Sequence, residues 1–220
     1  MNRKYDLILF DLDGTVFDTA ETILNSLKAT IENAGLRKLT QEEVDTFIGP
    51  PIIDSLHRYY PELSDEDIDS LTKKYRKYYL EHELLKAKPF KNIPEVITTL
   101  KENGYKVALA TYKLMKCVTP LFEHYDMTKY FDTLRGSINE KGLTKTDIMR
   151  LAIEDCKITD YDRVCMIGDT EHDLRGAINL GVAFIGVNYG AGFKGLTDEE
   201  KNYKKCLGYV DDAIEILDLV

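Results

Sequence analysis

The sequence predicts an α/β protein in which a doubly wound parallel sheet is interrupted, after its first strand, by a small all-α domain. Short apolar runs alternate with segments of helical periodicity, which is typical of a parallel sheet with crossover helices. The stretch over about residues 17–87 instead carries one helical pattern after another. Polar and acidic residues directly follow several of the apolar runs, as they do where parallel strands end at a functional site.

The first apolar run, Leu7–Phe10, is predicted to be a buried parallel strand, because no polar residue alternates with its apolar ones. The segment that follows is predicted to be all helical. Its expected helices cover residues 21–34, a short segment opened by the capping box Thr40–Glu43, and a segment that starts at Ser64. The tyrosines of the last helix recur at helical spacing, so we expect them to form a core.

Strand and helix patterns alternate again from residue 88 onward. The expected helices cover residues 93–103, 114–125, 144–154 and 174–180, and the expected strands lie at 107–110, 132–135, 164–167 and 182–185. We therefore expect residues 1–16 and 88–220 to form the α/β core domain and residues 17–87 to form an inserted domain.

Composition excludes some classes of partner. The chain has 220 residues, a formal net charge of −9 and no basic stripe, which disfavours nucleic-acid binding. No apolar window approaches the ~18 residues of a membrane span, so no membrane segment is expected. The four cysteines show no Cys-x-x-Cys spacing, which indicates reduced thiols in a cytoplasmic protein.

Two acidic residues, Asp11 and Asp13, follow the first strand directly and precede Gly14. Asp-Gly is a common turn sequence, so the pattern alone also fits an ordinary turn. Two carboxylates one residue apart repel each other unless a cation lies between them, however, and Mg²⁺ is the cation we expect.

More polar residues follow the later elements: Thr111 and Lys113 follow the second core strand, Lys145 opens a helix, and Asp169 and Asp173 follow a later strand. In a parallel sheet these positions meet at one edge. A carboxylate there can attack phosphorus, another can shuttle protons and others can hold Mg²⁺. A lysine and a hydroxyl can neutralise phosphoryl oxygens.

On these motifs the chain resembles the haloacid dehalogenase superfamily, and within it the phosphoglycolate phosphatase group with an α-helical, C1-type cap. The matching segments are Asp11–Thr19, Phe47–Pro51, Thr111 with Lys113, Lys145, and Gly168–Asp173. The resemblance implies a Rossmann-like core, a cap formed by the inserted domain, and an Mg²⁺-dependent phosphatase. Its substrate would be a small, phosphoglycolate-like monoester, hydrolysed through an aspartyl-phosphate.

The resemblance also implies roles for the acidic residues. Asp11 would be the nucleophile and a metal ligand. Asp13 would protonate the leaving oxygen and then activate water, and its backbone carbonyl would bind Mg²⁺. Asp169 would be a further metal ligand, and Asp173 would either join the ligands or hold them in place.

Phosphate binding would fall to Thr111 and Lys145, with the nearby Lys141 as an alternative for the lysine. The residue after Thr111 is usually Asn or Ser in this family, but here it is Tyr112. Its backbone N–H could still bind phosphate, while its side chain changes the pocket.

Other activities on the same fold stay open: a nucleoside 5′-monophosphatase, a pyrophosphatase, or, less favoured, a phosphosugar mutase. Related mutases have a histidine twelve positions after the nucleophile, where this chain has Ile23. A hydrocarbon side chain can neither donate nor accept a hydrogen bond, so hydrolysis is favoured. The expected partner is a small phosphorylated metabolite, bound by a monomer or homodimer.

Overall fold

A computed structural model describes residues 3–48, 50–138 and 143–220. The chain divides into two compact units, one made of Met1–Asp18 with Pro89–Val220 and the other of Thr19–Lys88. Within the described ranges, no helix is both long and apolar enough to cross a membrane.

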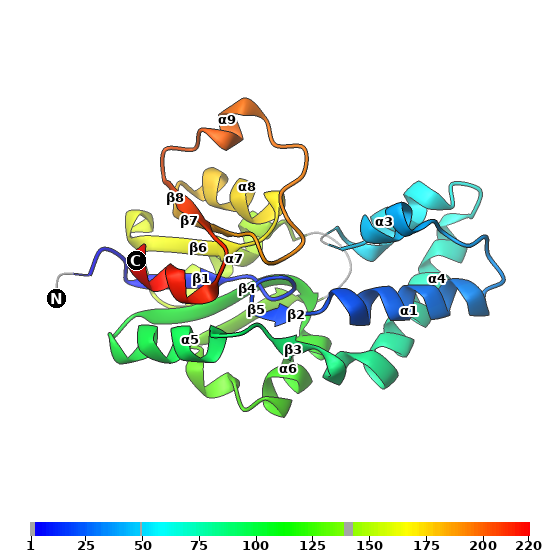
Figure 1. The fold of residues 1–220 in the computed structure, drawn as a ribbon, viewed down its shortest axis with the longest axis horizontal. Helices are drawn as coiled ribbons and strands as arrows, with labels where there is room; N and C mark the ends of the chain where they lie inside the picture. The colour runs from blue at the N-terminus through cyan, green and yellow to red at the C-terminus, as the bar shows by residue number, and fades with distance from the viewer. Residues whose placement is uncertain (1–2, 49, 139–142) are drawn as a thin grey trace. The chain divides into compact units, whose positions relative to one another are not determined.

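The first unit contains a six-stranded sheet in which every pair of neighbouring strands is parallel (Figure 1). In spatial order the strands are β5 (Thr133–Ser137), β4 (Lys106–Leu114), β1 (Leu7–Phe10), β6 (Val164–Gly168), β7 (Ala183–Val187) and β8 (Cys206–Val210). The predicted α/β class is therefore confirmed. The edge strand β8 was not predicted, and two short strands, β2 (Phe17–Asp18) and β3 (Lys88–Pro89), form a separate pair.

Helices cover both faces of the six-stranded sheet (Figure 1). They are α5 (Ile93–Glu102), α6 (Met115–His124), α7 (Lys145–Asp155) and α8 (Glu171–Leu180), followed by the short α9 (Asp198–Lys201). Leu7 and Leu9 of β1 join a core cluster with α7 and α8. On the opposite face, the Phe10 ring packs edge to face against Phe131, with 6.5 Å between centroids. Burial on both faces explains why β1 is a continuous apolar run.

Strand β1 is the point at which the order of the sheet reverses. The chain first moves from β1 to β4 and β5 on one side, and later to β6, β7 and β8 on the other. Ligands of open α/β sheets bind outside the carboxyl ends of strands at such a switch point. The residues that follow Phe10 are therefore in the position where this architecture places its chemistry.

The second unit is built from helices α1 (Ala20–Asn33), α2 (Gln41–Asp45), α3 (Ile52–Tyr59) and α4 (Asp65–Tyr78), and α4 continues into a π-helix over Tyr79–Glu83. The predicted capping box at Thr40 is present, and the helix predicted to start at Ser64 does so with a capping box of its own. The unit has its own core, in which Tyr60 and Tyr75 pack with aliphatic residues of α1, α3 and α4. Helix α3 was not predicted as a separate element.

Candidate active site

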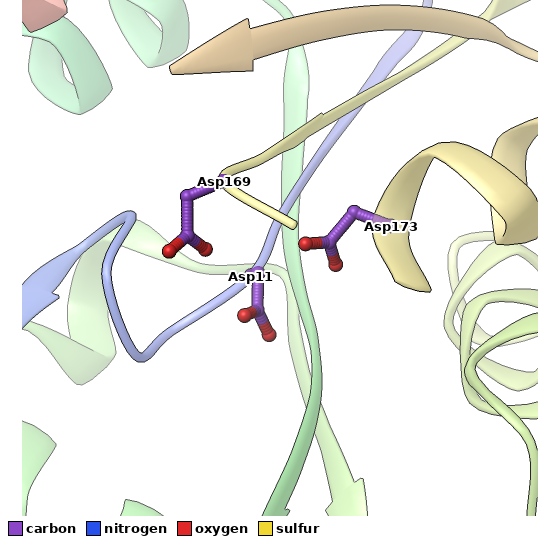
Figure 2. A group of neighbouring side chains, drawn as sticks. All are labelled: Asp11, Asp169 and Asp173. Carbon is purple, nitrogen blue, oxygen red and sulfur yellow. The ribbon is translucent and has the colours of Figure 1, made fainter. Parts of the chain in front are cut away.

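Three acidic side chains converge at the carboxyl edge of the sheet (Figure 2). Asp11 follows β1, Asp169 follows β6, and Asp173 lies in the first turn of α8. Each offers a carboxylate oxygen within 4.8 Å of the other two, and all three residues are buried. The backbone N–H of Asp11 donates to the carbonyl of Ile167 at 2.9 Å. This hydrogen bond continues the β1–β6 ladder and holds the backbone of Asp11 beside β6.

Asp169 is enclosed by backbone on two sides. Its Oδ1 accepts from the Thr15 hydroxyl at 3.1 Å and its Oδ2 accepts from the backbone N–H of Ala191 at 2.7 Å. A Cβ added to Gly14 would lie 2.0 Å from Oδ2, and one added to Gly190 would lie 2.4 Å from it. Both positions therefore require glycine, and the loop after β7 forms one wall of the site. The sequence alone did not indicate a role for this loop.

Asp173 is held by the start of its own helix. Its Oδ2 accepts from the backbone N–H and the hydroxyl of Thr170, at 3.1 and 2.8 Å. This contact begins α8 at Glu171, so the predicted start near residue 174 was three residues late. The spacing from Thr170 to Asp173 resembles that of a capping box, a signal present in the sequence.

Lys145 joins two of the three carboxylates. Its Nζ lies 2.6 Å from Asp11 Oδ1 and 2.6 Å from Asp173 Oδ1, and the second contact is ionic without hydrogen-bond geometry. The residue occupies the first turn of α7, after a capping box at Thr144, and is only 3% exposed. The alternative lysine, Lys141, lies outside the described residues.

The electrostatics of this group indicate a deficit of positive charge. Burial, reinforced by Asp173 and Asp13, raises the pKa of Asp11 to about 6 although Lys145 opposes the change. Burial and the neighbouring carboxylates also raise the pKa of Asp169 well above its usual range. Burial alone would lower the pKa of Lys145, but the two carboxylates outweigh it and raise that pKa. One ammonium does not balance three buried carboxylates, so the donor set fits a divalent cation.

Asp13 lies apart from the three converging carboxylates. Its Oδ1 accepts from Lys113 Nζ at 2.7 Å, and its side chain is one-quarter exposed, at 25%. The expected contribution of Asp13 to the metal is its backbone carbonyl, so the position of its side chain does not conflict with that prediction. The contact with Lys113 joins residues far apart in the sequence, and no separate role for Lys113 was predicted.

Thr111 and Tyr112 lie near the end of β4. Thr111 is buried, and its hydroxyl accepts from the backbone N–H of Lys113 at 3.2 Å. The Tyr112 hydroxyl accepts from the backbone N–H of Lys145 at 2.9 Å, and its ring centroid lies 5.7 Å from Lys145 Nζ. The same ring meets His172 edge to face. The side chain of Tyr112 therefore contacts both Lys145 and His172.

A model of the haloacid dehalogenase-like hydrolase family matches residues 8–187. A 5′-nucleotidase from Pseudomonas aeruginosa is 30% identical over 189 residues, which cover 86% of this chain and 85% of that protein. A phosphoglycolate phosphatase from Aquifex aeolicus is 28% identical over 177 residues, covering 80% and 81%. A pyrophosphatase from Halalkalibacterium halodurans is 28% identical over 186 residues, covering 84% and 85%.

Solved structures show the same relationship. One from Clostridium acetobutylicum, described as a predicted phosphatase, has a TM-score of 0.83 and 31% identity, with 98% of this chain and 97% of that one covered. A haloacid dehalogenase-like hydrolase from Streptococcus pneumoniae shares the fold, with a TM-score of 0.84, 24% identity and 98% of each chain covered. The match to the family model spans most of the chain, including the strands that carry the acidic site. The chain therefore belongs to the haloacid dehalogenase-like hydrolase family.

Proposed function

We propose that this protein hydrolyses a small phosphate monoester in an Mg²⁺-dependent reaction that passes through an aspartyl-phosphate on Asp11. The chain is a phosphatase of its family. The observation that carries the proposed mechanism is the position of Asp11. This carboxylate lies at the switch point of the sheet, pairs with the buried Lys145 at 2.6 Å and belongs to a cluster of three acidic residues.

The phosphatases of this family generally use a divalent metal ion, and the acidic cluster has the oxygen ligands that Mg²⁺ prefers. Asp11, Asp169 and the backbone carbonyl of Asp13 would hold the ion, while Asp173 is engaged by Thr170 and Lys145. When bound, Mg²⁺ neutralises charge on the phosphoryl oxygens.

In the first step, a carboxylate oxygen of Asp11 attacks phosphorus. The bond between phosphorus and the leaving oxygen breaks, and its electron pair stays on that oxygen. Asp13 gives the leaving oxygen a proton, so the first product departs neutral at that atom. Lys145 keeps Asp11 oriented and offsets negative charge, and Thr111 supplies a hydroxyl for a phosphoryl oxygen.

In the second step, water attacks the phosphorus of the aspartyl-phosphate. Asp13 takes a proton from the water, the bond from phosphorus to Asp11 breaks, and inorganic phosphate leaves. The two steps use Asp13 in opposite directions, so it ends the cycle in the protonation state in which it began.

We further propose that the helical unit acts as the cap. The insert predicted from the sequence covers residues 17–87, and the compact unit is Thr19–Lys88. As a cap, this unit would exclude water and select the substrate. Ile23 lies in α1 of this unit and offers no polar atom to gate the proton of Asp13, which supports a hydrolase over a mutase.

The proposed substrate class is supported by the relatives, whose names include phosphoglycolate phosphatase, pyrophosphatase and 5′-nucleotidase. All of these act on small phosphorylated compounds, and we favour a phosphoglycolate-like monoester. The test is release of inorganic phosphate from phosphoglycolate, pyrophosphate, nucleoside 5′-monophosphates and sugar monophosphates, each with Mg²⁺ and with EDTA.

The proposal predicts Mg²⁺-dependent release with phosphoglycolate among the best substrates, and no release by an Asp11→Asn variant. Activity that persists in EDTA would overturn the metal requirement. Formation of isomerised sugar phosphate faster than free phosphate, in the presence of a bisphosphate activator, would instead indicate a mutase.

A further inference from the structure

A second lysine, Lys113, contacts the carboxylate that the proposed mechanism uses for proton transfer. Its Nζ lies 2.7 Å from Asp13 Oδ1, and the lysine side chain is only 8% exposed. Burying an ammonium costs free energy unless a partner compensates it. Such burial is not typical of a surface ion pair. In the Lys101–Asp132 pair of the same unit, the two side chains are 31% and 33% exposed.

The backbone around Lys113 is shaped to bring its side chain to this position. The register between β4 and β5 shifts between Ala110 and Leu114, and Lys113 lies within that irregular stretch. Its N–H is occupied by the Thr111 hydroxyl at 3.2 Å. Departures from regular strand pairing, such as β-bulges, redirect side chains and are common beside active sites.

The facing strand accommodates the irregularity through Gly136. A Cβ at that position would lie 2.4 Å from the carbonyl oxygen of Lys113, a contact that backbone atoms cannot relieve by rotation. The irregular stretch of β4, the glycine on β5 and the ion pair therefore form one local arrangement. Its result is that the ammonium of Lys113 reaches Asp13 Oδ1.

We propose that Lys113 is a positioning residue for Asp13. The lysine fixes the carboxyl group through Oδ1 and leaves Oδ2 to transfer the proton. In the first step, the proton on Oδ2 passes to the leaving oxygen as the bond from that oxygen to phosphorus breaks. This inference rests on the proposed function, in which Asp13 is the general acid and base.

The inference predicts a dependence on the leaving group. A more acidic phenol, such as p-nitrophenol, departs as the phenolate without a proton. A less acidic phenol, such as phenol itself, needs the proton from Asp13. Substituted phenyl phosphates have nearly the same shape but differ in this requirement. Lys113→Met should slow the first turnover of phenyl phosphate ~100-fold, at the lower end of the 10²–10⁴-fold range of general acid catalysis. The loss with p-nitrophenyl phosphate should be only about threefold.

The measurement is rapid-quench release of the phenol in a single turnover, with Mg²⁺ present, across the phenyl phosphate series. Single turnovers isolate the step in which the phenol departs from the later hydrolysis of the aspartyl-phosphate. Lys113→Arg keeps the positive charge and should recover most of the lost rate on phenyl phosphate. Lys101→Met is the matched control, because it removes a lysine from an ion pair of 2.6 Å in the same unit. It should leave the leaving-group dependence unchanged.

Asp13→Asn separates failure of this inference from failure of the proposed function. If Asp13→Asn shows no leaving-group dependence, Asp13 is not the acid and the proposed mechanism fails. If Asp13→Asn shows that dependence but Lys113→Met slows all phenyl phosphates equally, only the inference fails. Lys113 then acts on the phosphoryl group or on folding. The double variant gives the positive test: Lys113→Met should cost little further rate once Asp13 is Asn, because both changes remove the same function.

Lys113→Arg also keeps the inference testable if the Met variant folds poorly, since a displaced charge should give a smaller loss with the same leaving-group trend. Far-UV circular dichroism identifies variants that fold. An Arg variant whose losses are equal on every phenyl phosphate would overturn the inference.

Discussion

Replacing Asp11 by Asn should stabilise the metal-free protein at pH 8 while abolishing turnover. Burial raises the pKa of Asp11 to about 6, compared with the ordinary value of 3.8. Between these two pH values the folded protein binds more protons than the unfolded chain. Protonation of Asp11 therefore stabilises the folded protein relative to the unfolded chain. This stabilisation is fully present below pH 4 and is lost as the pH rises through 6.

The magnitude follows from the same two values. A difference of about two pH units, at ~1.4 kcal/mol for each, is about 3 kcal/mol by which ionised Asp11 destabilises the fold at pH 8. Asn is neutral at every pH and nearly isosteric, so the variant avoids this cost. Lys145 keeps Asp173 as a partner, which limits the penalty of removing Asp11.

The assay is urea denaturation of wild type and Asp11→Asn in EDTA between pH 4.5 and 8. The gain in unfolding free energy should grow as the pH rises and level off above pH 7. Saturating Mg²⁺ should reduce or reverse the gain, because a ligand at 100 times its Kd stabilises the wild type by ~2.7 kcal/mol. An Asn variant that is equally or less stable than wild type at pH 8 in EDTA would refute the electrostatic reasoning.

Three further changes test other parts of the site. Asp13→Asn should lower kcat on phosphate esters by ~10²–10⁴-fold while Mg²⁺ still raises the melting temperature, since the expected ligand is a backbone oxygen. Gly190→Ala should destabilise the protein by ~1–3 kcal/mol in urea titrations and impair activity, because its Cβ would lie 2.4 Å from Asp169 Oδ2. Tyr112→Phe removes a hydrogen bond to the backbone of Lys145 and should cost ~1 kcal/mol of stability, with a fall in kcat measured alongside; unchanged values of both would contradict that role.

Local pattern predicted most of the core fold. The run Leu7–Phe10 is apolar throughout because helices cover both faces of its sheet, and that pattern needs no knowledge of distant residues. Capping boxes at Thr40, Ser64 and Thr144 are equally local, since each joins residues three apart. Where local signals were weak, elements were missed. Strand β8, for example, is an edge strand that contains Gly208 at φ +150°.

The type of chemistry could be predicted from local sequence. Asp11, Asp13 and Asp169 follow apolar runs that must be strands, and parallel strands end at one edge. Their identity and order indicated a phosphate site before any distance was known, and the structure brings Asp11 and Asp169 together with Asp173. Their individual roles stay predictions.

Which polar atoms contact one another depends on the three-dimensional fold. The pairing of Lys145 with two carboxylates depends on how α7 packs on the sheet, and the hydroxyl of Tyr112 reaches the Lys145 amide through the same packing. The contact between Lys113 and Asp13 depends on an irregular stretch of β4 and a glycine on β5. Strand register and helix packing arise from contacts between residues far apart in the chain. Local periodicity carries no information about those contacts, so the hydrogen bonds and ion pairs of the site could not be predicted from the sequence.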